Sequence, residues 1–173
     1  MSKTKIFLMA ISMAIFSGCG GGGIINEAVN IKTECDWVDY AFRLLNEMHK
    51  DFTAVAEREG INSSQDNREH MFLVYDAMST YEKQDFENKA ILFEILEATR
   101  RYHTRGLGDW NQKDLENCPN FNKVRRMANS RGFRFEKILR EVKGDYNTKE
   151  QFIAEFPSFP KNVLEHFSFL FEN

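Results

Sequence analysis

The feature that most restricts the fold of this chain is a hydrophobic repeat of three to four residues, which begins near residue 36 and continues almost to the end. Within residues 36–59 the repeat is formed by Val38, Phe42, Leu45, Met48, Phe52 and Val55. Such spacing places the apolar side chains on one face of an α-helix. No proline precedes Pro119, and no segment alternates apolar and polar residues as a half-buried strand does. The sequence therefore predicts an all-α fold.

Helical segments follow one another along the chain, separated by glycine, proline or short polar turns. We expect them at residues 36–59, 66/67–81, 83–104, 111–117, 119–130, 133–143, 148–156 and 161–171. Gly60 is expected to end the first segment, and Thr148 to cap the start of a later one. The first three segments are long, and their short connections predict antiparallel neighbours. We therefore predict a single domain, residues 35–173, folded as a bundle of six or seven helices.

The first 19 residues have the organisation of an export signal. Lys3 and Lys5 give a positively charged start, and an apolar run of eleven residues, 6–16, follows them. This run is well short of the roughly 20 apolar residues that a transmembrane helix needs. The segment ends with Phe16-Ser17-Gly18-Cys19, an arrangement that resembles the lipobox of bacterial lipoproteins.

The resemblance implies that residues 1–18 are removed as a signal peptide. Cys19 would then become the palmitate-carrying first residue of a lipoprotein in the bacterial cell envelope. Gly20 follows the cysteine in place of Asp, which in lipoproteins of Gram-negative bacteria implies sorting to the outer membrane, facing the periplasm; the implication does not extend to a Gram-positive source. The alternative is an ordinary cleaved signal peptide, with Cys19 free or in a disulfide. Both interpretations predict an exported protein.

Four consecutive glycines, Gly20 to Gly23, follow the cysteine. Glycine has no side chain to pack and the greatest backbone freedom, so such a run is typical of a flexible linker. We expect residues 19–34 to form a tether of about 15 residues, whose random-coil reach is roughly 20 Å. The folded domain would then stay close to its membrane.

Two cysteines remain once Cys19 is assigned to the lipid, namely Cys35 and Cys118. In the oxidising compartment that the export signal implies, we expect them to form a disulfide. The bridge would close a loop of about 83 residues and stabilise the fold by about 4 kcal/mol in the chain-entropy model. The alternative is two buried free thiols, as in a chain that is not exported. No CxxC motif or paired-histidine spacing predicts a metal site.

Charge is distributed unevenly along the mature chain. Without the two leader lysines, 21 of the 23 basic residues remain against 26 acidic ones, a net charge of about −5 that argues against nucleic-acid binding. Residues 35–97 hold fourteen acids and six bases, whereas residues 123–143 hold eight bases and two acids. The basic segment either solvates one face and partly neutralises the acidic helices, or it binds an acidic partner.

The second possibility makes particular residues candidates for partner binding. The basic candidates are Arg125, Arg126, Arg131, Arg134 and Arg140, and the face could extend to Arg100, Arg101, His103 and Arg105. Aromatic residues are concentrated near the C-terminus, where most are expected in the core. If Phe159, Phe169 and Phe171 form an exposed apolar patch instead, they become candidate anchors for a partner protein.

No common catalytic motif is present. The four histidines show no HExxH pattern, and neither a GxSxG motif nor a Walker A loop occurs. Carboxylate pairs such as Glu57 with Glu59, or Glu94 with Glu97, could in principle serve a glycosidase, but 26 acids make such pairs common by chance. We therefore expect no catalytic residue, metal or cofactor.

Two classes of function remain. The first is a membrane-anchored envelope lipoprotein that acts as a protein-binding module, serving an exported or envelope protein as inhibitor, immunity protein or assembly component. The alternative is a cell-wall-active or lipid-active enzyme whose carboxylates converge only in three dimensions. A deep cleft with paired carboxylates would favour the enzyme, and a basic or apolar surface patch would favour the binding module.

Overall fold

The computed structural model describes residues 22–62, 67–129 and 148–171. These ranges contain eight α-helices, five of them with seven or more residues, together with one π-helical and two 3₁₀ turns, and no strand. The prediction of an all-α fold is therefore confirmed. The helix expected at residues 133–143 lies outside the described residues.

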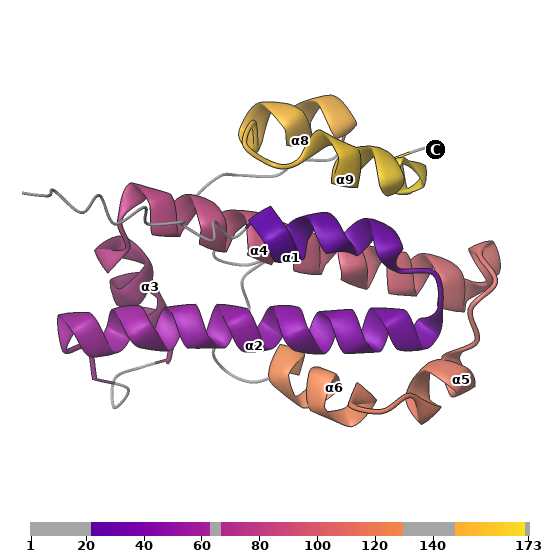
Figure 1. Cartoon of the computed structure of the whole chain (residues 1–173), viewed down its shortest axis with the longest axis horizontal. Helices are drawn as coiled ribbons and strands as arrows, with labels where there is room; N and C mark the ends of the chain where they lie inside the picture. Colours follow the sequence, from indigo (N-terminus) through magenta and orange to yellow (C-terminus); the bar gives the residue numbers. More distant parts are fainter. Residues whose placement is uncertain (1–21, 63–66, 130–147, 172–173) are drawn as a thin grey trace, which may run out of the picture.

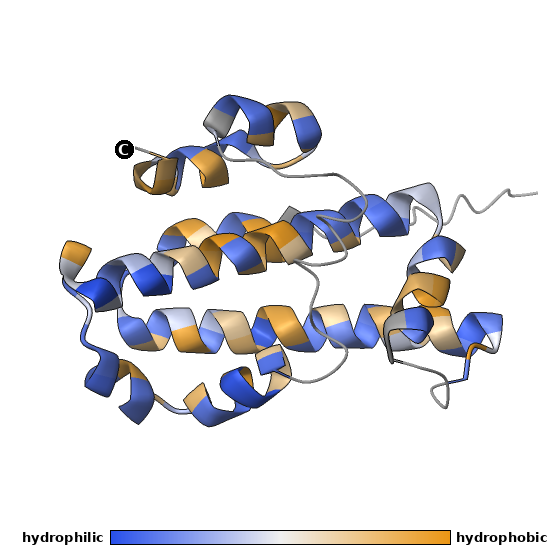
Figure 2. Ribbon diagram, turned by 180° about the vertical axis from the view of Figure 1, so that it is seen from behind, coloured by the Kyte–Doolittle hydropathy of each residue, from blue (hydrophilic) through white to orange (hydrophobic). Residues whose placement is uncertain are grey.

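Two long helices, α2 (Glu34–Glu59) and α4 (Thr80–Tyr102), form the centre of the molecule. They run antiparallel, so that the start of α2 lies beside the end of α4 (Figure 1). The Trp37 indole N–H donates to the Leu96 carbonyl at 2.8 Å and ties these two ends together. The helices bury their hydrophobic faces against each other and their neighbours (Figure 2). Fully buried side chains of the pair include Trp37, Leu44, Leu45, Met48, Ile91, Leu92 and Leu96.

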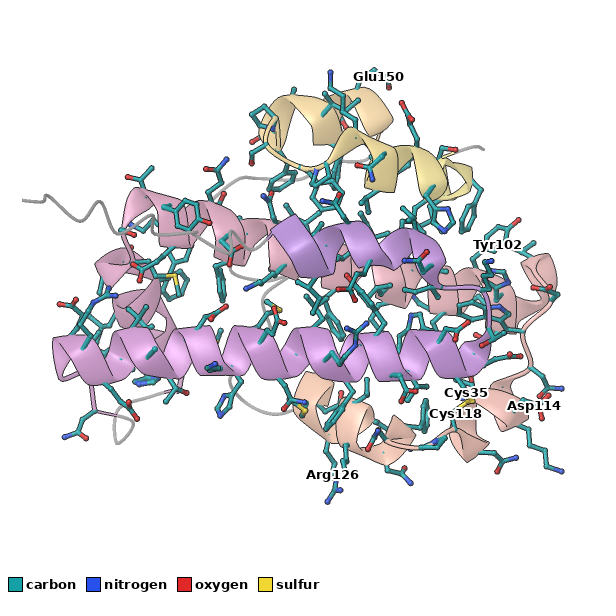
Figure 3. The ribbon with its side chains drawn as sticks, in the orientation of Figure 1. Cys35, Tyr102, Asp114, Cys118, Arg126 and Glu150 are labelled. Atoms are coloured by element: carbon teal, nitrogen blue, oxygen red, sulfur yellow. A yellow bond between two sulfur atoms is a disulfide. The ribbon has the colours of Figure 1, made fainter. Side chains whose placement is uncertain are left out.

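A helix pair covers the side of α2 that faces away from α4 (Figure 1). The pair consists of α5 (Gln112–Asn117) and α6 (Phe121–Asn129). The predicted Cys35–Cys118 disulfide is confirmed and joins the start of α2 to the link between α5 and α6, with 5.2 Å between the two Cα atoms (Figure 3). Helix α6 begins later than the expected residue 119, because Asn120 has a φ of 67°, a left-handed conformation that no α-helix contains.

The C-terminal elements lie over α1 and α4, on the opposite side of the molecule from α5 and α6 (Figure 1). They are α8 (Lys149–Glu155), α9 (Lys161–His166) and the 3₁₀ turn η3 (Ser168–Phe171). The expected cap at Thr148 is present, since its hydroxyl accepts the Gln151 N–H and its own N–H donates to the Gln151 side chain. Four buried phenylalanines attach this unit to the core, namely Phe152, Phe156, Phe159 and Phe167.

The connection between α2 and α4 differs from the prediction. Helix α3 (Asn67–Ala77) is shorter than expected, and α4 begins earlier than the expected residue 83. The cause is a capping box in which the Ser79 hydroxyl accepts the Glu82 N–H at 3.3 Å and the Glu82 carboxylate accepts the Ser79 N–H at 2.8 Å. The bundle is therefore built on two long helices and not on three.

Residues 22–34 belong to the folded domain. Helix α1 (Gly22–Glu27) and the 3₁₀ turn η1 (Ala28–Asn30) contact α4 and α9. The Tyr40 hydroxyl donates to the Ile24 carbonyl and ties α1 to α2. The prediction of a flexible tether over residues 19–34 is thus wrong for residues 22–34. These residues carry a helically spaced set of apolar side chains that are buried in the core: Ile24, Ile25, Ala28 and Ile31.

A buried lysine links α2 to α4. Lys89 is only 4% exposed, and its Nζ lies 2.6 Å from Asp51 Oδ2, 2.8 Å from Asp85 Oδ2 and 3.8 Å from Glu47 Oε2. Burial by itself lowers the pKa of a lysine, but hydrogen bonds to Asp51 and Asp85 outweigh it, and the pKa of Lys89 is raised above its ordinary value. Lys89 therefore stays charged at neutral pH.

Candidate functional site

The basic residues of α6 lie on the outer side of the molecule. Lys123, Arg125 and Arg126 are exposed, whereas Phe121 and Val124 of the same helix are buried. This division follows from the helical period, which separates the polar and apolar residues of α6 (Figure 2). Arg126 points away from the body of the molecule (Figure 3). We refer to Lys123, Arg125 and Arg126 as the α6 basic face.

Carboxylates of the acidic helices do not neutralise the α6 basic face. Several other cations have a carboxylate partner within 2.8 Å, in the pairs Arg43–Glu27, Arg58–Glu82, Lys89–Asp51 and Arg100–Glu97. Among the described residues, no ion pair involves Lys123, Arg125 or Arg126. Lys123 lies over the Phe42 ring at 5.3 Å, and the Arg126 Nε donates to the Asn122 carbonyl. Ion pairing with the described carboxylates therefore does not account for these three cations.

A cavity of about 300 Å³ adjoins the α6 basic face and lies between α2, α4, α5 and α6. Trp37, Phe121 and Val124 belong to its apolar lining, and all three are buried. Its polar lining consists of Glu97, Arg100, Gln112, Glu116, Arg125 and Asn129. The cavity thus brings Arg100, from the end of α4, together with Arg125 of the α6 basic face.

The two carboxylates in the cavity already have partners. Arg100 donates to Glu97 through two nitrogens, at 2.8 and 3.3 Å, and the Gln112 amide donates to Glu116 Oε1 at 2.8 Å. Both oxygens of Glu97 and one oxygen of Glu116 are thus already occupied by hydrogen bonds. Glu94, the expected partner of Glu97, does not line this cavity.

The second carboxylate pair considered from the sequence, Glu57 and Glu59, lies at the exposed end of α2. Arg58 Nε contacts Glu59 Oε1 at 2.8 Å, and neither carboxylate lines the cavity. The geometry of a glycosidase, with two carboxylates facing one substrate, is not formed by this pair.

The alternative of an exposed patch formed by Phe159, Phe169 and Phe171 is not seen, and the three side chains pack against the core. Phe159 is 4% exposed and packs edge-on against Phe152, with ring centroids 5.5 Å apart. Phe169 and Phe171 are half-buried, with centroids 4.9 Å from Tyr102 and 5.9 Å from Phe152 respectively. Phe169 does not project outward because α9 ends at residue 166, and the 3₁₀ turn η3 changes the angle between successive side chains from that of an α-helix.

The end of α4 holds an aromatic cluster that no sequence motif reveals. The helix continues as a π-helical turn, η2 (His103–Leu107), in which Gly106 has a φ of 86°. His103 stacks on Trp110 with ring centroids 4.2 Å apart, and Phe169 lies 6.2 Å from His103. His103 is thus held inside the fold, while the other expected extensions of the basic surface, Arg101 and Arg105, are exposed.

Several predicted residues fall outside the described part of the chain. They are the lipidation candidate Cys19 and the binding candidates Arg131, Arg134 and Arg140. In the ranges that the structure does describe, no helix combines the length and hydrophobicity of a membrane-spanning segment. Nor do His, Cys, Asp and Glu side chains gather there into a group of three that could hold a metal ion.

Comparison with known proteins leaves the chain without an assigned family. No family model matches it, and no match is found among curated proteins or among solved structures. A function must therefore be argued from the site itself.

Proposed function

We propose that the chain is a membrane-anchored lipoprotein of the bacterial cell envelope that binds another protein through the α6 basic face. The proposed anchor is Cys19, because residues 16–19 resemble a lipobox, and Gly20 favours the outer membrane, facing the periplasm. The proposed partner is an acidic exported or envelope protein. The chain would act on it as an inhibitor, an immunity protein or an assembly component.

The observation that carries this proposal is the lack of ion pairs at the α6 basic face within the described ranges. Helix α6 packs on α2, which belongs to the acidic segment 35–97 with its fourteen acids and six bases. Cations that served only to balance this charge would pair with it, as Arg58 does with Glu82. Exposed, unpaired cations instead raise the rate and the specificity with which an acidic partner binds.

A cell-wall-active or lipid-active enzyme is the alternative, and the cavity lined by Glu97 and Glu116 is the observation in its favour. Both carboxylate oxygens of Glu97 already accept hydrogen bonds from Arg100, which argues against its acting on a substrate. Glu97→Gln and Glu116→Gln separate the two functions. An enzyme would hydrolyse purified peptidoglycan or phospholipid and lose that turnover in the variants, whereas a binding module would show no turnover in either form.

Cys19→Ala tests the anchor. In cells supplied with labelled palmitate, the wild type should incorporate the label, and the variant should stay unlabelled and unprocessed. Cys35→Ser removes a different cysteine and should leave labelling intact, which makes it the matched control. Palmitate on the Cys19→Ala chain would overturn the lipobox interpretation.

Site-specific photo-crosslinking in intact envelopes tests the binding surface. Asn122 and Asn129 line a surface depression with Arg125 and Arg126, so crosslinkers at these two positions report on the α6 basic face. They should capture one acidic protein, whereas a crosslinker at Glu57, at the far end of α2, should not.

Charge reversal then shows whether the capture depends on the cations. Arg125→Glu combined with Arg126→Glu should abolish the crosslink, and higher salt should weaken it in the wild type. Both residues are exposed, so the variant should keep its melting temperature. A crosslink that survives charge reversal, or one equally strong from position 57, would refute this surface.

A further inference from the structure

The cavity beside α6 contains two opposite charges that are not paired with each other. Glu116 on α5 and Arg125 on α6 both line it. Among the described residues, neither makes an ion pair, which also means that their charged groups lie more than 4.0 Å apart. Glu116 accepts one hydrogen bond, from the neutral amide of Gln112. One cavity thus has a separate acceptor for a cation and a separate donor for an anion.

The apolar part of the lining, formed by Trp37, Phe121, Val124 and Ala128, is largely buried. Trp37 is 1% exposed, and its indole N–H is fixed on the Leu96 carbonyl at 2.8 Å. Phe121 and Val124 are also buried. The remaining charged residues, Arg100 and Glu97, neutralise each other. A ligand therefore meets a preformed apolar wall, which lowers the ordering cost of binding.

We propose that this cavity binds a zwitterionic ligand with an apolar body, namely an apolar amino acid or a short apolar peptide. The ligand's ammonium group pairs with Glu116, its carboxylate pairs with Arg125, and its side chain packs against Trp37 and Phe121. A volume of about 300 Å³ lies at the small end of ligand pockets, so it suits one or two residues better than a longer chain. This inference does not depend on the α6 basic face binding a protein.

The two charges of the ligand are essential to the proposal. A ligand with a carboxylate alone leaves Glu116 without a cationic partner, and a ligand with an ammonium alone leaves Arg125 without an anionic partner. Losing one charge-assisted hydrogen bond costs about 1.5 to 3 kcal/mol, or roughly ten- to a hundredfold in affinity. Blocked ligands therefore separate a zwitterion site from a simple apolar crevice.

Titration followed by ¹H–¹⁵N NMR tests the proposal on the full, oxidised chain in detergent micelles. The probes are leucine, Leu-Leu and Leu-Leu-Leu, and the reporter is the Trp37 indole N–H resonance. Trp110 does not line the cavity, so its indole resonance is an internal control. At least one probe should shift Trp37 saturably and leave Trp110 in place. Tightest binding of leucine would assign the site to free amino acids, and tightest binding of a peptide would assign it to peptides.

Ligands with one charge blocked, and variants of the two charged residues, distinguish a zwitterion site from an apolar crevice. N-acetyl-leucine and leucine amide should bind about tenfold or more weakly than leucine, and the matching blocked peptides should do likewise. Glu116→Gln and Arg125→Gln should each weaken the best probe by a similar factor, while Lys113→Gln and Asp114→Asn, exposed charges of α5 outside the cavity, should not. No saturable shift with any probe, or equal binding of blocked and free forms, would overturn the zwitterion site.

Different residues report on the ligand site in the cavity and on protein binding at the α6 basic face, so the failure of one proposal can be told from the failure of the other. Glu116 and Trp37 report on the cavity and do not belong to the α6 basic face. Lys123 and Arg126 belong to that face and do not line the cavity. Lys123→Glu with Arg126→Glu should therefore remove the protein crosslink and leave probe binding within about twofold of the wild type.

Discussion

Lys89 is the one charged residue that is buried in the described part of the chain, and its partners come from two helices. Without its charge, Asp51 and Asp85 would face each other uncompensated. Because Asp51 is about half exposed, the loss should fall at the low end of that for breaking a buried ion pair. We expect Lys89→Met to lower the free energy of unfolding by about 3 kcal/mol, measured by urea denaturation at pH 7.

Two further variants show whether the charge is responsible. Lys83→Met changes a partly exposed lysine on the same helix, whose Nζ bonds the Asp76 carbonyl, and should cost no more than about 0.5 kcal/mol. Adding Asp51→Asn and Asp85→Asn to Lys89→Met should recover most of the stability, since the two closest carboxylates are then neutral and only the half-exposed Glu47 remains. If the triple variant is no more stable than Lys89→Met, the loss comes from packing and not from charge.

Glu82 makes the stability of the fold depend on pH. Its carboxylate accepts two nitrogens of Arg58, at 2.6 and 3.2 Å, and also caps α4 through Ser79. The pKa of Glu82 is lowered from 4.5 to about 2. The hydrogen bond with Arg58 is the largest cause, and the bonds with Ser79 add to it. A carboxyl whose pKa is lowered by folding contributes fully above its ordinary pKa and loses the contribution as the pH falls through the folded value.

Glu82→Gln should therefore lower the melting temperature at pH 7, and its difference from the wild type should shrink as the pH falls from 4.5 towards 2. Thermal unfolding followed by circular dichroism across this range measures the difference. Glu57→Gln, an exposed carboxyl without an ion pair among the described residues, should differ little from the wild type at any pH. A Glu82→Gln difference that stays constant down to pH 2 would contradict the assigned pKa.

At the scale of elements, the hydrophobic repeat predicted the helix boundaries correctly where a helix-ending residue such as glycine follows the repeat. Helix α2 ends before Gly60, whose φ of 66° continues no helix, as the glycine predicted. The boundary between α3 and α4 was misplaced because apolar residues continue through Met78. The spacing Ser79-x-x-Glu82 is the local signal that marks it.

The basic residues of the candidate site could be predicted from the sequence, whereas the cavity beside them could not. Arg125 and Arg126 were identified from charge along the sequence, and α6 does present them outward. The cavity was not predictable, because its lining comes from four helices whose packing depends on contacts far apart in the chain. Glu116 in particular has no sequence feature that distinguishes it from the other acids. Its role follows only from the position of α5 beside α2.

The disulfide determines how firmly α5 and α6 are held to α2. Cys35 and Cys118 are 83 residues apart, so in the chain-entropy model their bond contributes about 4 kcal/mol. We expect the Cys35→Ser/Cys118→Ser variant to lose about that much stability in urea denaturation, and amide hydrogen exchange to speed up first in α5 and α6. Dithiothreitol should destabilise the wild type equally and leave the variant unchanged. An unchanged wild type in reductant would show that the bond contributes little.

At the scale of the whole molecule, the packing of α1 moves the domain boundary to residue 22 or earlier. If Cys19 carries the lipid, Gly22 lies only three positions after it, a span of at most about 10 Å. The proposed anchor would thus hold the domain closer to the membrane than the roughly 20 Å of a 15-residue tether. The residue at which the domain begins therefore affects both the stability of the fold and the distance of the domain from the membrane.

Two fragments of the chain test this boundary. The fragment 22–173 keeps Ile24, Ile25 and Ile31 in the core, whereas the fragment 35–173 exposes the surfaces of α4 and α9 that they cover. Each buried isoleucine contributes about 1.5 to 3 kcal/mol, partly offset by the entropy of ordering α1. The shorter fragment should therefore be less stable by at least about 3 kcal/mol in urea denaturation. Ile25→Ala in the longer fragment should cost about 2 to 4 kcal/mol, and Asn30→Ala, at an exposed position of η1, almost nothing. Equal stability of the two fragments would mean that α1 is not part of the cooperative core.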